Sequence, residues 1–175
     1  QYGITYGSYS SLVSPPYDEL WPIEFAPKDA EQPLDEIFDK QFLMEQAKSF
    51  VWGVQPTIAN YHTFLESEKI EEIDYLMEIV KTRYNALDYL LYGEFCRNPD
   101  LYIPRENIDI SRLSIYAGRT GKTVTSFEKN VPSLYVGTWK AKNGNIAIAL
   151  ASISDAPITV SFVVKPEQYG ILPKG

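Results

Sequence analysis

The sequence contains very few of the residues that build covalent or metal sites. Among 175 residues it has one cysteine, Cys96, and one histidine, His62. A single cysteine excludes an internal disulfide framework and any metal site built on several cysteines. One histidine beside one cysteine also gives no ligand spacing for a metal. We therefore expect no metal and no cofactor, and we expect Cys96 to be a small buried side chain.

Clusters of basic residues and long apolar runs are also missing. The chain has 16 Lys and Arg against 23 Asp and Glu, a formal net charge of −7. Nucleic-acid-binding proteins normally carry a basic patch, so nucleic acid is not an expected partner. No uninterrupted apolar run approaches the ~20 residues that a membrane-spanning helix needs, so no membrane partner is expected either.

What the sequence does contain is a change in hydrophobic period. Apolar residues recur every three or four positions up to about Gly93, and every second position beyond Ile108. The first period is typical of helices and the second of half-buried strands. We predict an α/β portion followed by an all-β portion, with domains at residues 1–98 and 99–175.

The first portion alternates strands and helices. We predict strands at Tyr2–Gly7 and Val54–Asn60, and helices at Leu34–Trp52 and Glu66–Tyr92. This order is that of two βα units. The sequence opens on a strand, so we expect Gln1 to lie inside a larger α/β domain. One apolar stripe is predicted along the second helix, made of Ile70, Ile73, Met77, Val80, Tyr84, Leu87 and Leu91.

The second portion is predicted to be antiparallel. The strand candidates are Leu113–Tyr116, Val124–Glu128, Leu134–Ala141, Asn145–Ser152 and Ile158–Val164. Asn143-Gly144 between two alternating runs is a strong hairpin signal. Strands at this spacing with tight turns indicate a β-sandwich or barrel.

Carboxylates are the remaining candidates for chemistry. Asp18 and Glu19 lie in a proline-rich loop, and Glu66 and Glu68 lie near a helix start. Paired carboxylates do the work in most glycoside hydrolases, but acidic residues at a helix start commonly serve the helix dipole. The aromatic content of 14% fits either a sugar cleft or a packed core. The residues alone leave both alternatives open.

Two stretches together resemble TIM-barrel glycoside hydrolases. Gln46–Pro56 is a helix running into W-G-x-Q-P, and the next helix ends in Tyr92-Gly93, as in the closing βα units of those barrels. Val136–Val160 is similar to their C-terminal β-sandwich, with its W…NG…S-D-x-P run, although Ser152 stands where Asn is usual. The resemblance implies the end of a (β/α)8 barrel plus an antiparallel β-sandwich. It also implies an extracytoplasmic location, periplasmic or secreted.

In that family the nucleophile and general acid usually lie on earlier strands, so the catalytic residues of this chain stay unknown. The chain would be an inactive fragment of an enzyme. Tyr2–Gly7 and Val54–Asn60 would be the seventh and eighth barrel strands. One wall of the sugar cleft would then carry Tyr6, Trp21, Tyr61 and His62, from their places at strand ends. The implied partners are a carbohydrate and the remainder of the barrel.

The alternative is a carbohydrate-binding or structural β-sandwich module without catalysis. An exposed, coplanar row of rings such as Tyr135 and Trp139 would favour this alternative, and two buried rings would count against it.

Overall fold

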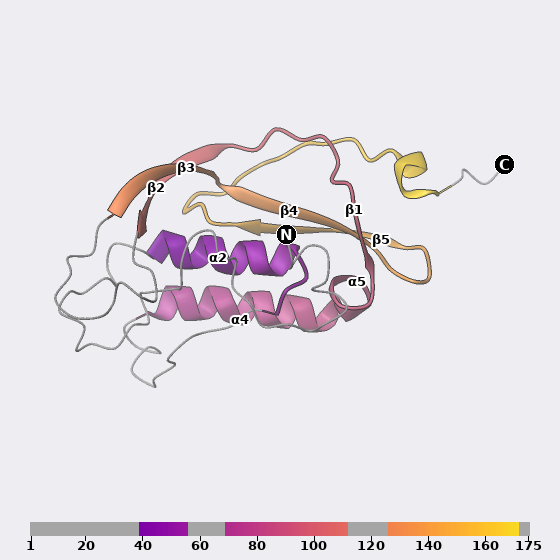
Figure 1. The fold of residues 1–175 in the computed structure, drawn as a ribbon, viewed down its shortest axis with the longest axis horizontal. Coiled ribbons are helices and arrows are strands. Elements are labelled where there is room, and N and C mark those ends of the chain that lie inside the picture. Colours follow the sequence, from indigo (N-terminus) through magenta and orange to yellow (C-terminus); the bar gives the residue numbers. More distant parts are fainter. Residues whose placement is uncertain (1–38, 56–68, 112–125, 172–175) are drawn as a thin grey trace.

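The structure is a computed structural model that describes residues 39–55, 69–111 and 126–171. Two helices lie beneath an antiparallel sheet, and extended segments cross its other side (Figure 1). In chain order the elements are α2 (Asp39–Val51), α4 (Ile70–Asn85), α5 (Leu87–Leu90), β1 (Glu94–Cys96), β2 (Arg105–Ser111), β3 (Ser126–Pro132), β4 (Leu134–Lys140), β5 (Ile146–Ser152) and the 3-10 turn η3 (Pro166–Tyr169). Helices followed by antiparallel strands are therefore confirmed, whereas the end of a barrel stays a prediction.

Helix α2 is enclosed by the rest of the molecule. Apolar Phe42 and polar Gln41 and Glu45 are all fully buried. The predicted helix Leu34–Trp52 is confirmed over residues 39–51, and its first residues lie outside the described ranges. Gly53 ends the helix with a φ of 72°, a left-handed conformation that glycine adopts without steric cost.

The second predicted helix is shorter than Glu66–Tyr92. Helix α4 ends at Asn85, and α5 starts again at Leu87 after a break at Ala86, whose φ of −117° is not helical. The break turns the chain so that Leu90 is 2% exposed. Burial of this leucine explains why a helical pattern that looks continuous in the sequence is interrupted.

The apolar stripe predicted on α4 is not its buried side. Ile70, Met77 and Tyr84 are 57%, 46% and 75% exposed, whereas Leu76 and Ile79 are 7% and 6% exposed. Both sets recur at helical spacing, so the periodicity predicts a helix without deciding which side packs. The sequence predicted one stripe, and the structure adds that α2 covers the other apolar side, which carries Leu76 and Ile79.

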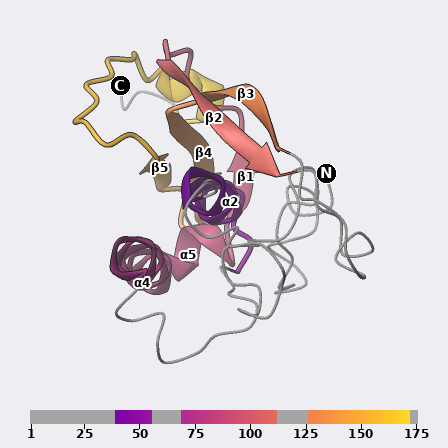
Figure 2. The ribbon, with the colours of Figure 1, turned by 90° about the vertical axis from the view of Figure 1, so that its left-hand side faces the viewer.

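Helices α2 and α4 run in the same direction. Phe42, near the start of α2, packs against Leu76 in the first half of α4. At the other end, the Arg83 guanidinium donates to the Gly53 carbonyl at 3.2 Å. Figure 2 shows α2 beneath β4 and α4 below β5. Consecutive parallel helices are the arrangement that consecutive βα units produce.

The three-stranded sheet has the order β1–β4–β5. Strands β4 and β5 confirm the candidates Leu134–Ala141 and Asn145–Ser152. They pair antiparallel, with Tyr135 opposite Ala151 and Trp139 opposite Ala147. The hairpin predicted at Asn143-Gly144 joins them, and Gly144 has a φ of 88°. Strand β1 pairs with β4 and was not predicted.

Strands β2 and β3 form a separate antiparallel pair, with Arg105 opposite Pro132 and Ser111 opposite Ser126. Strand β3 overlaps the candidate Val124–Glu128 but extends to Pro132. Strand β2 was not predicted, because its charged sequence RENIDIS carries only two apolar residues, Ile108 and Ile110. Both isoleucines are buried.

The prediction of a last strand at Ile158–Val164 is wrong. The segment makes a single bridge, between Phe162 and Leu101. Its alternating pattern has another cause, since Ile158, Val160 and Phe162 are half-buried while their neighbours are exposed. One-sided packing of an extended chain therefore gives the same period as a strand. The candidates Tyr2–Gly7, Leu113–Tyr116 and most of Val54–Asn60 lie outside the described residues, and Val54 and Gln55 are not in a strand.

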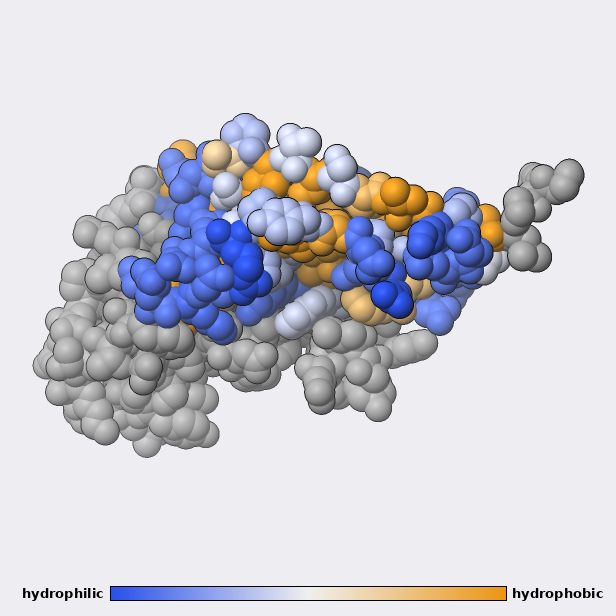
Figure 3. Space-filling model, turned by 90° about the horizontal axis from the view of Figure 1, so that it is seen from above, coloured by the Kyte–Doolittle hydropathy of each residue, from blue (hydrophilic) through white to orange (hydrophobic). Residues whose placement is uncertain are grey.

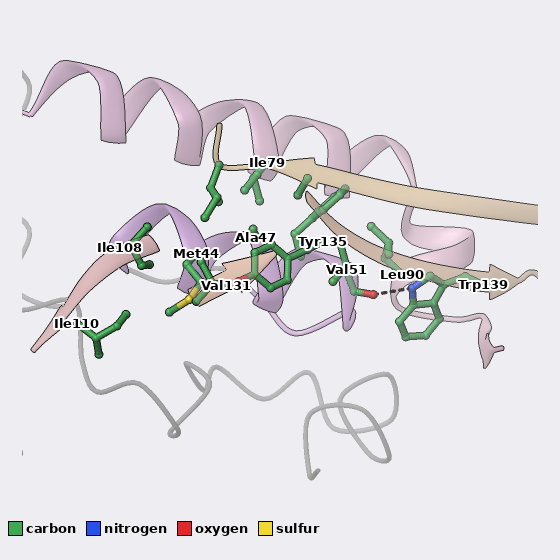
Figure 4. Packing of buried hydrophobic residues seen from close by; sticks show 13 residues of the cluster. Met44, Ala47, Val51, Ile79, Leu90, Ile108, Ile110, Val131, Tyr135 and Trp139 are labelled. Carbon is green, nitrogen blue, oxygen red and sulfur yellow. Dashed lines mark hydrogen bonds between the residues drawn. The ribbon is translucent and has the colours of Figure 1, made fainter. Parts of the chain in front are cut away.

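One hydrophobic core joins the helices to both sheets (Figure 4). Its members include Met44, Ala47, Val51, Ile79, Leu90, Ile108, Ile110, Val131, Tyr135, Trp139, Ala151 and Ile153. The core therefore crosses the position 98–99 where we predicted a domain boundary, and β1, from the N-terminal side, pairs with β4. The division into two domains stays a prediction.

The C-terminal end of α2 lies directly against β4. The Trp139 indole Nε1–H donates to the Val51 carbonyl at 3.0 Å. A Cβ at Gly137 would lie 2.1 Å from that same carbonyl oxygen, and one at Gly53 would lie 2.7 Å from the Trp139 ring. Both positions therefore require glycine for this close approach. We call Val51, Gly53, Gly137 and Trp139 the helix–sheet joint.

Candidate functional site

The four residues predicted for the sugar cleft lie outside the described residues. Tyr6, Trp21, Tyr61 and His62 fall in the ranges 1–38 and 56–68. Their proposed role stays a prediction, and so do the carboxylates Asp18, Glu19, Glu66 and Glu68. A candidate site has to be found among the residues that are described.

A pocket of about 440 Å³ lies where α5, β1 and the end of β4 meet. This volume is within the usual range of small-molecule sites. The aromatic and charged residues of its lining are Tyr92, Glu94, Lys140 and Lys142. We call it the Tyr92 pocket. Leu91, Gly93 and Ala141 complete the lining.

Local backbone geometry places these side chains. Residue Glu94 is the register partner of Lys140 in the β1–β4 ladder. A Cβ at Gly93 would lie 2.4 Å from the Tyr89 carbonyl and 2.9 Å from the Lys140 carbonyl. Glycine therefore allows the chain to pass from α5 into β1 directly beside β4. Lys142 follows β4 in the turn of the β4–β5 hairpin.

The pocket has two ammonium groups and one carboxylate. Lys140 Nζ donates to the Tyr169 carbonyl at 2.9 Å, which holds that lysine in place. Lys142 Nζ lies 5.9 Å from the centre of the Tyr92 ring, within the range of a cation–π interaction. Tyr92 itself is 58% exposed. The arrangement offers hydrogen-bond donors beside an accessible aromatic face.

This chemistry suits binding rather than hydrolysis. Glycoside hydrolysis uses a pair of carboxylates about 5–9.5 Å apart, and Glu94 is the one carboxylate of the pocket lining. Among residues 39–55, 69–111 and 126–171, no cluster of His, Cys, Asp and Glu could hold a metal ion. The same residues include no helix that is long and apolar enough to span a membrane.

Cys96 is a weak nucleophile in this setting. Its thiol lies on β1 near the pocket and donates to the Glu94 carbonyl at 3.6 Å. Burial, and secondarily the Glu94 carboxylate, raises the pKa of the thiol, with Lys140 acting in the opposite direction. A raised pKa lowers the fraction of the thiol that is present as thiolate, which is the reactive form. The residue is half-buried, not buried as we predicted, because β1 is an edge strand of the sheet.

The rings of Tyr135 and Trp139 are both buried, at 9% and 0% exposure. Trp139 makes an edge-on contact with Phe95, with ring centres 5.0 Å apart. The two rings therefore form no exposed aromatic platform, which counts against that version of the binding-module alternative. Sequence reasoning missed the Tyr92 pocket because its lining comes from two segments far apart in the sequence, 91–94 and 140–142. Only the hairpin signal at Asn143-Gly144 pointed to one of them.

The face above the sheet is apolar along its middle, with hydrophilic residues at both ends (Figure 3). The exposed apolar residues of the described ranges include Tyr102, Leu150, Val163 and Val164. A surface of this kind is suited to packing against another surface.

Comparison of the chain with protein-family models, with curated proteins and with solved structures finds no match in any of the three. The resemblance to glycoside hydrolases therefore stays an expectation from the sequence, and function has to be argued from the residues.

Proposed function

We propose that this chain is the C-terminal portion of a glycoside hydrolase. It would comprise the last two βα units of a barrel and the accessory β-sandwich, and its barrel part would form one wall of the cleft that binds the carbohydrate. The remaining barrel would supply the catalytic carboxylates. The isolated chain would be inactive, because one wall cannot hold two carboxylates about a glycosidic bond.

The observation that carries the proposal is the helix–sheet joint. The two stretches that carry the resemblance, Gln46–Pro56 and the G-T-W of β4, contact each other there, through Gly53 with Trp139 and Val51 with Gly137. The residues of each contacting pair are 86 positions apart, since 139 minus 53 and 137 minus 51 are both 86. Their contact gives both motifs a shared packing role, as expected where one of the closing barrel helices meets an accessory sheet.

Two further observations support the proposal. Helices α2 and α4 are parallel neighbours, as consecutive helices of a (β/α)8 barrel are. The exposed stripe on α4, with Ile70, Met77, Val80 and Tyr84, gives that helix a second apolar side. A barrel helix needs such a side because it packs on strands as well as on its neighbours.

The test compares the chain with its parent protein. We expect the parent to be longer at the N-terminus by roughly six βα units and to hydrolyse aryl glycosides, while the 175-residue chain does not. Intact mass and a panel of chromogenic glycosides measure both. A parent that starts at Gln1, or hydrolysis by the isolated chain, would contradict the proposal.

The second candidate is a carbohydrate-binding or structural module, and the Tyr92 pocket is the observation that favours it. Calorimetric titration with oligosaccharides tests this function. We expect Tyr92→Ala to abolish binding and Tyr102→Ala, at a residue 86% exposed and outside the pocket lining, to leave it unchanged. Equal binding by both variants would exclude the pocket.

A further inference from the structure

Strand β5 is an edge strand without the usual protection. It lies at one end of the order β1–β4–β5, and no strand within the described ranges pairs with its other side. Its sequence IAIALAS contains no charged residue and no proline. Native edge strands commonly carry charges, proline or bulges that prevent pairing with another chain. An uncharged edge of seven residues is therefore competent to accept a further strand.

A pocket of about 300 Å³ opens beside this edge, between β5 and the helices. Leu150 and Ala151 of β5, Phe50 of α2 and Ile79 of α4 form its apolar lining. Its volume is at the lower limit for small-molecule sites, which suits one side chain better than an oligosaccharide. Tyr75 also lines it, and the Tyr75 hydroxyl is buried with no hydrogen-bond partner in the described part of the chain.

The charge beside the pocket is acidic. Glu78 lines it, and Glu71 and Asp74 are exposed on the same helix. The Lys81 ammonium pairs with Glu78 at 2.7 Å, so these three carboxylates and one ammonium leave the rim with a net negative charge. The β5 strand of a second copy contains no charged residue, so edge-to-edge pairing of two β5 strands would bring no basic side chain from that strand to this rim. A partner strand with a basic residue would complement it.

We propose that the β5 edge accepts an extended strand of another polypeptide, which inserts one apolar side chain into the pocket and places a basic side chain beside Glu78. Backbone pairing would supply affinity, and the pocket with its acidic rim would supply specificity. The inference rests only on β5, α2 and α4, and it does not depend on the proposed function.

The experiment uses two synthetic nine-residue peptides and the isotopically labelled 175-residue chain. Valine and threonine alternate in both peptides around a central leucine. One peptide has lysine two positions from the leucine, and the other has glutamate there. In NMR titrations at 0.15 M salt, we expect shifts at β5 and Tyr75, and about tenfold tighter binding of the lysine peptide.

Three variants test whether the peptide binds at the β5 edge and beside Glu78. Leu150→Lys should weaken binding of the lysine peptide at least tenfold, because it places a charge on the edge. Glu78→Lys should reverse the preference between the two peptides. Met77→Lys is the matched control, since Met77 is exposed on α4 but does not line the pocket, and we expect no change. Far-UV circular dichroism checks that each variant is folded.

Several results would overturn the inference. Binding without saturation below about 1 mM peptide, or equal affinity for both peptides, would do so. Protection of the outward β5 amides from exchange in the free chain would mean that the edge is already occupied. Self-association that Leu150→Lys abolishes would identify a second copy as the occupant instead.

Discussion

Two glycines, Gly53 and Gly137, lie against the helix–sheet joint. Each would place a Cβ within 3 Å of neighbouring atoms, Gly53 against the Leu90 carbonyl and the Trp139 ring, and Gly137 against the Val51 carbonyl. Gly144 provides a natural comparison, because its φ is also positive but its Cβ would meet nothing within 4 Å. Comparing substitutions at Gly53 and Gly144 therefore separates the free-energy cost of the left-handed backbone from the cost of a steric clash.

We expect Gly53→Ala to lower the free energy of unfolding by about 3 kcal/mol, from left-handed backbone strain together with overpacking. Gly144→Ala should cost about 1 kcal/mol, from the backbone term alone. Urea denaturation followed by circular dichroism at 222 nm measures both. Equal losses would show that the close approach of Gly53 to Trp139 contributes nothing.

The second prediction at this scale concerns Tyr135. Burial, the largest cause, raises the pKa of its hydroxyl, with Arg105 opposing and Tyr75 and Glu106 adding to the rise. The hydroxyl also has no hydrogen-bond partner among the described residues. Above pH ~10 the unfolded chain loses this proton and the folded chain keeps it. The contribution of Tyr135 to the free energy of unfolding should therefore be constant below that pH. Above it, this contribution should fall by about 1.4 kcal/mol per pH unit.

Tyr135→Phe should remove this contribution and make the alkaline loss of stability less steep. At pH 7 the variant should be as stable as the parent or more stable, because it deletes an unsatisfied buried hydroxyl. Urea midpoints between pH 7 and 11 measure the effect. Tyr102→Phe, at a residue 86% exposed, is the control. Identical slopes for the parent and Tyr135→Phe would contradict the prediction.

At the scale of elements, α4 has two apolar sides, and the described part of the chain covers only one of them. Ile79 packs in the core that α2, β4 and β5 share, while Ile70 on the same helix is 57% exposed. Apolar residues at the same helical spacing therefore contribute differently to the free energy of unfolding on the two sides.

We expect Ile79→Ala to cost about 3 kcal/mol, through lost burial and the cavity that it leaves. Ile70→Ala, the same chemical change on the same helix, should cost less than about 0.5 kcal/mol. Urea denaturation of both variants under one set of conditions gives the difference. Similar losses would mean that the Ile70 side of α4 is also packed.

At the scale of the whole molecule, a single core includes residues from both sides of position 98–99. Val51 and Ile79 precede it, and Val131 and Trp139 follow it. A shared core of this kind couples the unfolding of its elements.

We therefore expect α2 and β4 to unfold together. Amide hydrogen exchange measured at low urea should give equal opening free energies for residues in both, within about 1 kcal/mol. Loss of α2 protection well below the urea concentration that exposes β4 would instead support two domains divided at 98–99.

Several elements could be predicted because their signals are local. Alternation plus Asn143-Gly144 predicted the β4–β5 hairpin, and apolar spacing plus Gly53 predicted α2 and its end. Strand β2 was missed because only two of its residues, Ile108 and Ile110, are apolar. Its strand conformation depends on the pairing with β3, which the local sequence does not indicate. The Tyr92 pocket was missed for a related reason, since Tyr92, Glu94 and Lys142 come together only when β1 pairs with β4.

The sequence by itself determined that helices come first and antiparallel strands later, because the period of apolar residues depends on local backbone geometry. Only the tertiary structure decided which side of α4 is buried, where that helix breaks at Ala86, and that Ile158–Val164 packs as an extended chain with a single bridge. Those outcomes depend on which surfaces meet. A period of 3.6 or 2 is the same whether a residue faces the core, another chain or water.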